Sequence, residues 1–278
     1  MIERVSVLGQ PAVRLVAPDG AEATVLLHGA HVVSWIPAGD QERLYLSPQA
    51  VAGPGQAVRG GIPVIFPQFN TRGPLPRHGF ARSRAWQWAE QAERGGAAIG
   101  VLRLEADEAT RALWPHGFSA ELTVVVSGLQ LDLELEVTNT GDTPFELQAA
   151  LHSYLRLDDL RRARLKGLFG AEYEDMLDKG AVRRQEFDPQ SFIGEIDRVY
   201  RGVRWPLTLA SAFGHLALDS EGFSDVVVWN PGAVGAAEIG DLPDEDWPAF
   251  LCVEAAQIAE PVRLAPGEEW VARHTLAA

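Results

Sequence analysis

The feature of this chain that most restricts its fold is a long series of segments in which apolar and polar residues alternate. The pattern is clearest in four segments: residues 97–107, 119–127, 129–139 and 145–157. Because successive side chains of a β-strand point to opposite faces, this period of two predicts strands that each have one buried face. Gly, Pro, Asn or Asp bounds each segment, and Ser127-Gly128 predicts a hairpin turn between two of them. The chain is therefore expected to form antiparallel sheet.

The strand pattern continues to the end of the chain, and helix signals are few. HLALDS, DVVVWNP, FLCVEAAQI and EWVARHTLA are further strand candidates, whereas helical turns are expected only at 107–113 and near 241–246. Strands without intervening helices favour an all-β fold, a large antiparallel sandwich, over a doubly wound α/β fold. No linker, charged tail or low-complexity segment interrupts the pattern, so residues 1–278 are interpreted as a single domain.

The composition bears on the solubility and the cellular location of the protein. The 278 residues are 46% apolar, enough for a sizeable core, but they contain no run of 18 apolar residues and no basic-apolar leader. The single cysteine, Cys252, has no partner for an internal disulfide and is expected to be a buried, unreactive thiol. These features predict a soluble cytoplasmic protein.

The distribution of charge is uneven. A net charge of −14 would repel polyanions, so nucleic acid and anionic membranes are not expected as partners. Residues 43–89, however, contain no Asp or Glu and six arginines: Arg43, Arg59, Arg72, Arg77, Arg82 and Arg84. The planar guanidinium suits paired contacts with carboxylate or phosphate. Composition alone leaves two interpretations open, an anion-binding site and a solvated basic surface.

Several familiar functional motifs are missing. The chain has no glycine-rich phosphate loop ending in Gly-Lys-Ser/Thr, no dinucleotide-binding fingerprint and no serine in a nucleophile-elbow pattern. His28 and His31 in LHGAHVV are three residues apart, which on a strand places them on opposite faces. A structural role is therefore favoured for them over metal binding.

Two titratable residues interrupt apolar strands. His152 lies in LQAALHSYL, where alternation places it on the same face as Gln148, Ala150 and Tyr154. Glu254 lies in AFLCVEAAQI, where a carboxylate is costly to bury unless it is paired or reaches a wet cleft. Both residues suggest a site, although a core or solvent-facing position is the common alternative for each.

Taken together, several segments resemble one known family. RGGIPVIFPQF, LPRHGFARS, LQAALHSYLRL, DRVY, DVVVWNP, CVEAA and LAPGEEW occur in the order found in glucose-6-phosphate 1-epimerases, a branch of the aldose 1-epimerase superfamily. The resemblance extends from about residue 10 to about residue 275. It implies a galactose-mutarotase-like β-supersandwich, which agrees with the predicted strands. It also implies interconversion of the α and β anomers of a hexose 6-phosphate, above all glucose 6-phosphate, by a monomer that uses no cofactor and no metal.

The same resemblance implies site residues. His152 in ALHSY matches the catalytic histidine, and Glu254 in CVEAA matches the catalytic glutamate. The substrate-binding positions that it implies are Arg59, His78, Arg82, Asp197 and Asp225. Asp225 has a turn-capping role as its alternative. Arg72, Arg77 and Arg84 are further candidates. The sequence departs from the family pattern at Gln68-Phe69-Asn70, where many relatives have an aromatic or aliphatic residue followed by Phe-Gly.

The implied reaction explains why these residue types are needed. Ring opening requires a base at the C1 hydroxyl and an acid at the ring oxygen, roles that we expect for Glu254 and His152, with His78 binding sugar oxygens. Ordinary pKa values of about 4.3 for Glu and about 6.5 for His would leave Glu254 ionised and His152 protonated close to neutrality. Arginines would hold the phosphate, and the glycines at 60, 61 and 79 would let the loop backbone approach the sugar.

Two other classes of protein remain open at this point. A non-catalytic carbohydrate-binding sandwich would use aromatic residues such as Trp86, Trp88 and Trp229 without turning a substrate over. A metal-dependent enzyme would use His78, His152 and Glu254 as ligands, since two histidines and a carboxylate form facial triads.

Overall fold

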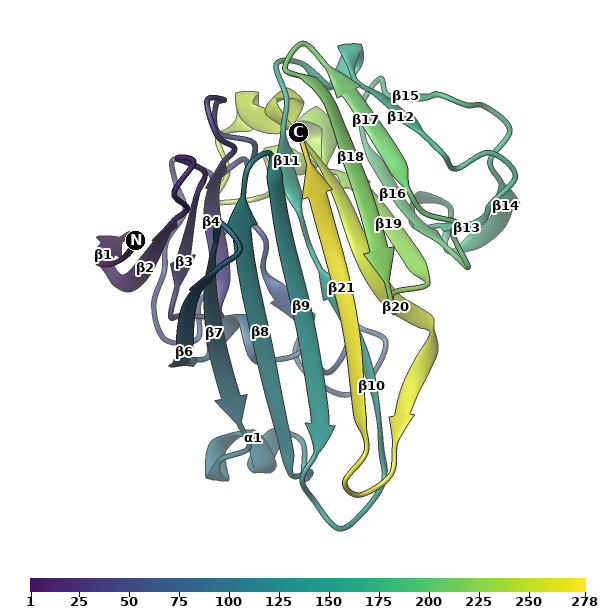
Figure 1. Cartoon of the computed structure of the whole chain (residues 1–278). Coiled ribbons are helices and arrows are strands. Elements are labelled where there is room, and N and C mark those ends of the chain that lie inside the picture. Colours follow the sequence, from purple (N-terminus) through teal and green to yellow (C-terminus); the bar gives the residue numbers. More distant parts are fainter.

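The computed structural model describes all residues from Met1 to Ala278 and contains three antiparallel sheets (Figure 1). The smallest, on the left of Figure 1, has the strand order β1 (Ile2–Val7), β2 (Gln10–Val16), β3 (Glu22–Leu26), β4 (His31–Ile36). The nine-stranded sheet has the order β15 (Gln190–Ser191), β12 (Arg164–Lys166), β17 (Leu207–Ser211), β18 (Gly214–Glu221), β21 (Glu269–Ala277), β9 (Gln130–Asn139), β8 (Phe118–Ser127), β7 (Ala97–Glu105), β6 (Gln87–Arg94).

The remaining eight-stranded sheet carries the residues that matter most below. Its strand order is β14 (Ala181–Arg184), β13 (Glu172–Asp175), β16 (Ile196–Tyr200), β19 (Asp225–Asn230), β20 (Phe250–Leu264), β10 (Phe145–Leu151), β5 (Val64–Ile65), and β11 (Tyr154–Arg156) also pairs with β20. Helical segments are short. They are α1 (Glu108–Leu113), α2 (Gly232–Ala236) and the 3-10 turns at Ala81–Ser83, Leu160–Arg162, Met176–Asp178 and Asp244–Ala249. None of these helices has the length and apolar content needed to span a bilayer.

The alternation of apolar and polar residues in the sequence matches an alternation of buried and half-exposed side chains in the structure. Along β8 and β9, every second residue is buried and the residues between them are half exposed, apart from an exposed residue at the start of β9. The buried residues join a cluster of 56 apolar side chains that takes members from all three sheets. Since burying one Val or Leu side chain stabilises a fold by about 1.5–3 kcal/mol, a one-residue slip of these strands would be very costly. The all-β prediction is confirmed.

The central strands of the eight-stranded sheet are buried on both faces, and this explains their apolar sequences. On β19, Val226 and Val228 face the main cluster, whereas Val227 belongs to a second cluster of seven residues on the opposite face. On β20, Ala255 and Ala256 divide in the same way. Strands covered on both faces have no solvent-facing positions, so they read as continuous apolar runs. A charged side chain on the second face of such a sheet is therefore unusual.

Several predicted boundaries need correction. The helix expected at 107–113 is α1, and Asp107 caps it by accepting a hydrogen bond from the Thr110 backbone N–H. The single strand expected over 145–157 is wrong, because β10 ends at Leu151 and β11 begins at Tyr154. The short helix α2 was not predicted. Cys252 is buried, as expected.

Candidate active site

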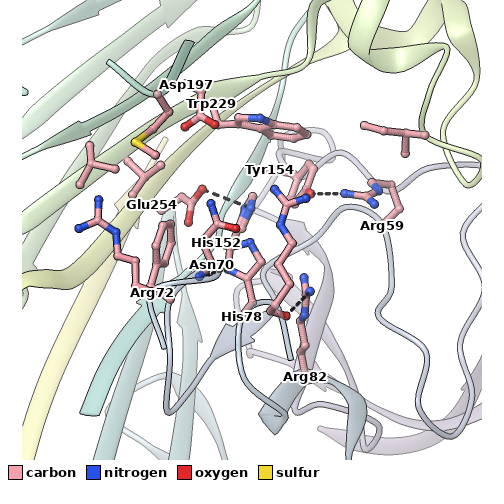
Figure 2. A pocket seen from close by; sticks show the side chains of 16 residues that line it. Arg59, Asn70, Arg72, His78, Arg82, His152, Tyr154, Asp197, Trp229 and Glu254 are labelled. Atoms are coloured by element: carbon pink, nitrogen blue, oxygen red, sulfur yellow. Dashed lines mark hydrogen bonds and ion pairs between the residues drawn. The ribbon is translucent and has the colours of Figure 1, made fainter. Parts of the chain in front are cut away.

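The register of the eight-stranded sheet brings His152 and Glu254 together. Leu151, the last residue of β10, pairs with Ala255 of β20, so the residue that follows β10, His152, comes beside Glu254. There the chain leaves the ladder, and the backbone N–H of His152 donates to Pro63 O instead. His152 Nε2 lies 3.2 Å from Glu254 Oε1 (Figure 2). The break that contradicts the predicted continuous strand is therefore the feature that presents the imidazole.

Both members of this pair are almost completely buried, and burial favours their uncharged forms. Burial lowers the pKa of His152 well below its ordinary value, and His78, Arg82 and Arg59 lower it further. Burial raises the pKa of Glu254 well above its ordinary value, and the nearby Asp197 adds to this shift. The expectation that both groups titrate near their ordinary values is wrong. His152 Nδ1 and Glu254 Oε2 have no hydrogen-bond partner within the protein.

The pair lies in the wall of a cavity of about 180 Å³. Figure 2 shows its side chains, most of which come from β16, β19 and β20, from the β10–β11 junction, and from the loop before Ala81 together with the 3-10 turn Ala81–Ser83. Arg59, Met176 and Ile239 come from other segments. The lining residues are Arg59, Phe69, Asn70, Arg72, Arg77, His78, Arg82, His152, Tyr154, Met176, Asp197, Val199, Val227, Trp229, Ile239 and Glu254. The cavity therefore brings together six of the seven site residues that the sequence indicated.

The loop between β5 and Ala81 presents His78 in a constrained conformation. His78 has a φ of +67°, and Asn70, at the other end of the loop, has a φ of +47°. The His78 backbone N–H donates to Asn70 O at 2.9 Å, and the Asn70 backbone N–H donates to His78 Nδ1 at 3.3 Å. Burial, together with Arg82, Arg77 and Arg59, lowers the pKa of His78 to about 2. His78 is therefore a neutral imidazole.

The arginines of the cavity differ in how far their charge is already compensated. Arg59 donates to Asp241 at 3.0 Å and to the Tyr154 hydroxyl at 3.0 Å. Arg72 is ion-paired with Glu174, which also binds Arg201. Arg82 and Arg77 form no ion pair. Arg82 donates to the backbone carbonyl of Arg77 at 3.0 Å.

Asp197 and Asp225, the two aspartates indicated by the sequence, have different positions. Asp197 on β16 lines the cavity, and burial raises its pKa to about 6. Asp225 on β19 does not line it. Asp225 Oδ2 accepts hydrogen bonds from the backbone N–H groups of Ile258 at 2.8 Å and Ala259 at 2.7 Å. Asp225 therefore stabilises the backbone of β20. This structural role is similar to the turn-capping alternative, in which the carboxylate also accepts hydrogen bonds from backbone N–H groups.

Other sequence-based expectations are also corrected. A Cβ at Gly79 would lie 2.2 Å from Phe66 O, and one at Gly60 would lie 2.4 Å from Tyr45 O. These glycines therefore allow close packing of backbone on backbone, not approach of a sugar. Arg84 lies outside the cavity lining. Trp86 is a core residue, and of the three tryptophans considered only Trp229 lines the cavity.

The two histidines near the start of the chain have structural contacts. His28 Nε2 hydrogen-bonds to Gln56 O at 2.7 Å, and His31 Nε2 to Gly60 O at 2.6 Å. The structure contains no group of three or more His, Cys, Asp or Glu side chains arranged to hold a metal ion. The metal-triad alternative for His78, His152 and Glu254 therefore has no matching geometry.

Sequence reasoning missed Tyr154 and Asn70 as members of the site. The Tyr154 ring stacks on the His152 ring, with centroids 4.8 Å apart. The sequence contained an indication of this role for Tyr154, because the alternation of apolar and polar residues places it on the same strand face as His152. Asn70 gave no positional signal, because its place in the wall depends on how the loop turns.

Comparisons with known proteins show the family of this chain. The family model described as Aldose 1-epimerase matches residues 11–277. A protein of Cenchrus ciliaris named "Putative glucose-6-phosphate 1-epimerase" is 35% identical over 266 residues, covering 92% of this chain and 81% of that protein. A protein of Escherichia coli K12 with the same name is 31% identical over 248 residues, covering 86% and 81%. A solved Salmonella typhimurium structure, described as "a putative mutarotase", matches with a TM-score of 0.91 and 28% identity, covering 99% of this chain and 92% of that one.

Proposed function

This chain belongs to the aldose 1-epimerase family, and we propose that it interconverts the α and β anomers of a hexose 6-phosphate, with glucose 6-phosphate as the preferred substrate. The observation that carries the proposal is the His152–Glu254 contact of 3.2 Å in a cavity that also holds two arginines without ion pairs. The His152–Glu254 pair would catalyse ring opening, and the two arginines would bind the phosphate. The proposal assigns this activity to one domain over residues 1–278, since the main core cluster draws on all three sheets.

The acid–base pair suits ring opening because of its spacing. The C1 hydroxyl oxygen and the ring oxygen are both bonded to C1, so two groups within one hydrogen-bond length of each other can reach both oxygens. Glu254 takes the proton of the C1 hydroxyl, and His152 gives a proton to the ring oxygen. The bond from C1 to the ring oxygen breaks and C1 becomes an aldehyde. Rotation about C1–C2 and the reverse proton transfers close the ring on the other face.

The protonation states follow from one shared proton. Before substrate binds, burial favours a protonated Glu254 and a neutral His152. Transfer of that proton from Glu254 to His152 generates the carboxylate and imidazolium that ring opening needs, without uptake of a proton from solvent. A bound phosphate dianion assists, because it offsets the positive field of Arg82 and Arg59 that opposes an imidazolium.

Arg82 and Arg77 are the proposed phosphate ligands, because both line the cavity and neither forms an ion pair. Arg59 contributes to the same positive field, but Asp241 and Tyr154 hold its guanidinium. In a chain with a net charge of −14, these arginines reverse the field locally and attract an anionic substrate. Asp197 and His78 are proposed to bind sugar hydroxyls and ring oxygens. Asp225 is not part of the proposed substrate site.

The wider setting of the protein is also part of the proposal. We propose that it works in the cytoplasm as a monomer, with a sugar phosphate as its partner. The buried Cys252, the only cysteine, supports a reducing compartment. The net charge argues against nucleic acid or an anionic membrane as a partner.

The proposal is tested by measuring α/β exchange of glucose 6-phosphate by NMR, with glucose and galactose in parallel. The parent protein should accelerate exchange of the phosphate ester above that of the free sugars. Glu254→Gln and His152→Ala should each lower kcat by about 10²–10⁴-fold with little change in KM. Binding of glucose 6-phosphate without acceleration would instead identify a non-catalytic carbohydrate-binding protein.

A further inference from the structure

The loop that carries His78 is built around the side chain of Gln68. Gln68 is buried, and its amide lies inside the loop and not in the cavity wall. Gln68 Nε2 donates to Asn70 O at 2.9 Å and to Leu75 O at 3.1 Å, and Gln68 Oε1 accepts from the Leu75 backbone N–H at 2.9 Å. A Cβ at Gly73 would lie 2.5 Å from Gln68 Oε1, so the loop closes tightly on this side chain. The amide of Gln68 thus supplies the loop with its internal hydrogen bonds.

Asn70 links this amide to the imidazole of His78. Asn70 O accepts from both Gln68 Nε2 and the His78 backbone N–H. The Asn70 backbone N–H donates to His78 Nδ1. Both residues have positive φ angles, a conformation that a non-glycine residue keeps only where its surroundings hold it. The orientation of the Asn70 backbone, and with it the hydrogen bond to Nδ1, therefore depends on Gln68.

This hydrogen bond decides which nitrogen of His78 carries the proton. Since Nδ1 accepts a hydrogen bond, the proton of the neutral ring lies on Nε2. The hydrogen bond at Nδ1 is the only one that the His78 ring makes within the protein, so Nε2 is left without a protein partner. The other groups that face the ring are the imidazole of His152, the arginines Arg59, Arg77 and Arg82, and the edge-on ring of Phe69. None of them is an acid that would favour an imidazolium.

We propose that Gln68 is a positioning residue that holds His78 as the Nε2–H tautomer, so that His78 donates a hydrogen bond to a substrate oxygen. His78 then cannot act as the base of the reaction, which leaves that role to Glu254. This last consequence rests on the proposed anomerase function. The tautomer itself does not, because it follows from contacts within the protein.

Gln148 provides a matched control. It is a second glutamine beside the same loop, and its Oε1 accepts from the Phe69 backbone N–H at 3.0 Å while its Nε2 donates to Ile258 O at 3.1 Å. Its amide forms no hydrogen bond with Asn70 or His78. Gln148→Leu therefore removes one hydrogen bond to the loop, at Phe69 next to Asn70, and one to β20, and leaves the hydrogen bond to His78 Nδ1 in place.

The test is long-range ¹H–¹⁵N NMR of protein labelled in the histidine rings, recorded from pH 8 to pH 5. The parent and Gln148→Leu should show His78 as a neutral Nε2–H ring that does not titrate in this range. Gln68→Leu and the isosteric Gln68→Glu, which loses both donated hydrogen bonds, should show a mixture of tautomers and a titration midpoint moved toward the ordinary value for histidine. An Nδ1–H ring or a titrating His78 in the parent would overturn the proposal, as would unchanged His78 signals in a folded Gln68 variant.

Activity measurements separate this inference from the proposed function. In the Gln68 variants, kcat for glucose 6-phosphate should fall at least about tenfold, and Gln148→Leu should retain the parent value within about threefold. Unchanged kcat in both Gln68 variants would overturn the positioning role. If the parent accelerates no sugar at all, the anomerase proposal fails, and the NMR result still decides whether Gln68 sets the tautomer.

Discussion

The imidazole of His152 lies flat against the phenol ring of Tyr154, with ring centroids 4.8 Å apart and ring planes 9° apart. The Tyr154 hydroxyl accepts a hydrogen bond from Arg59, and Asp241 holds Arg59 from the other side. The aromatic ring and the hydroxyl of Tyr154 thus have separate contacts. One face of the ring orients His152, and the hydroxyl anchors an arginine of the cavity.

Two substitutions of Tyr154 should separate these contacts. Tyr154→Phe keeps the stacked ring and loses the Arg59 hydrogen bond, so we expect KM for glucose 6-phosphate to rise about threefold to tenfold with kcat nearly unchanged. Tyr154→Leu removes the stacked ring, so kcat should fall about tenfold or more, because the His152 ring loses its fixed orientation. Steady-state kinetics on both variants test this difference. The same kinetic change in both would contradict separate roles.

The arginines without ion pairs should dominate phosphate binding. We expect Arg82→Ala and Arg77→Ala each to raise KM for glucose 6-phosphate by about 10- to 100-fold, the range for loss of one hydrogen bond to a charged group. Arg84→Ala, which removes an arginine from the same segment but outside the cavity lining, is the matched control and should change KM less than about twofold. If Arg84→Ala weakened binding as much as Arg82→Ala, net charge and not local contact would explain the effect.

Asp197 should make stability depend on pH in a defined direction. Burial raises its pKa in the folded protein to about 6, above the 3.8 of an unperturbed aspartate. The folded state therefore holds this proton more tightly, and its contribution to the free energy of unfolding is lost as the pH rises from about 4 to about 6. Asp197→Asn should be more stable than the parent by about 1–3 kcal/mol above pH 6, with the difference disappearing below pH 4.

Urea unfolding of both proteins at pH 4, 5, 7 and 8 measures this difference. The remaining titrating groups are common to the two proteins, and their contributions cancel to first order except for that of Glu254, whose pKa Asp197 raises. A stability difference that stays constant across this range would show that ionisation of Asp197 is not its source. We also expect Asp197→Asn to raise KM, since a neutral amide binds a sugar hydroxyl less strongly than a carboxylate.

Asp225 should act on stability and not on the substrate. Asp225→Ala leaves the buried backbone N–H of Ile258 and the partly buried N–H of Ala259 without an acceptor, so the free energy of unfolding should fall by about 2–4 kcal/mol. KM for glucose 6-phosphate should remain within about twofold of the parent value. A large rise in KM with unchanged thermal stability would return Asp225 to the list of substrate ligands.

The catalytic candidates could be found from sequence because they violate a local pattern. His152 and Glu254 are the polar interruptions of two apolar strands, and their motifs resemble those of a known family. Their protonation could not be found in this way. It depends on the burial of both groups in the folded chain, which favours their uncharged forms. The sequence therefore indicated which residues form the pair and mispredicted their charge.

For the arginines, the sequence indicated a shared site but not which residues form it. Sequence proximity placed Arg59, Arg72, Arg77, Arg82 and Arg84 in one segment free of acids, and this suggested a shared positive site. The carboxylate that binds Arg59 belongs to Asp241, 182 positions later in the chain. Arg72 is likewise ion-paired with a distant residue, Glu174. Only the folded chain shows that Arg77 and Arg82 line the cavity without an ion pair and that Arg84 lies outside the lining.

Alternation of apolar and polar residues by itself determined the all-β class and the buried face of β8 and β9, because side-chain direction in a strand is a local property with a period of two. The tertiary structure alone decided the break at His152, the left-handed backbone of Asn70 and His78, and the pairing of each arginine. These features depend on contacts between segments far apart in the chain, and such contacts leave no periodic signal in the sequence.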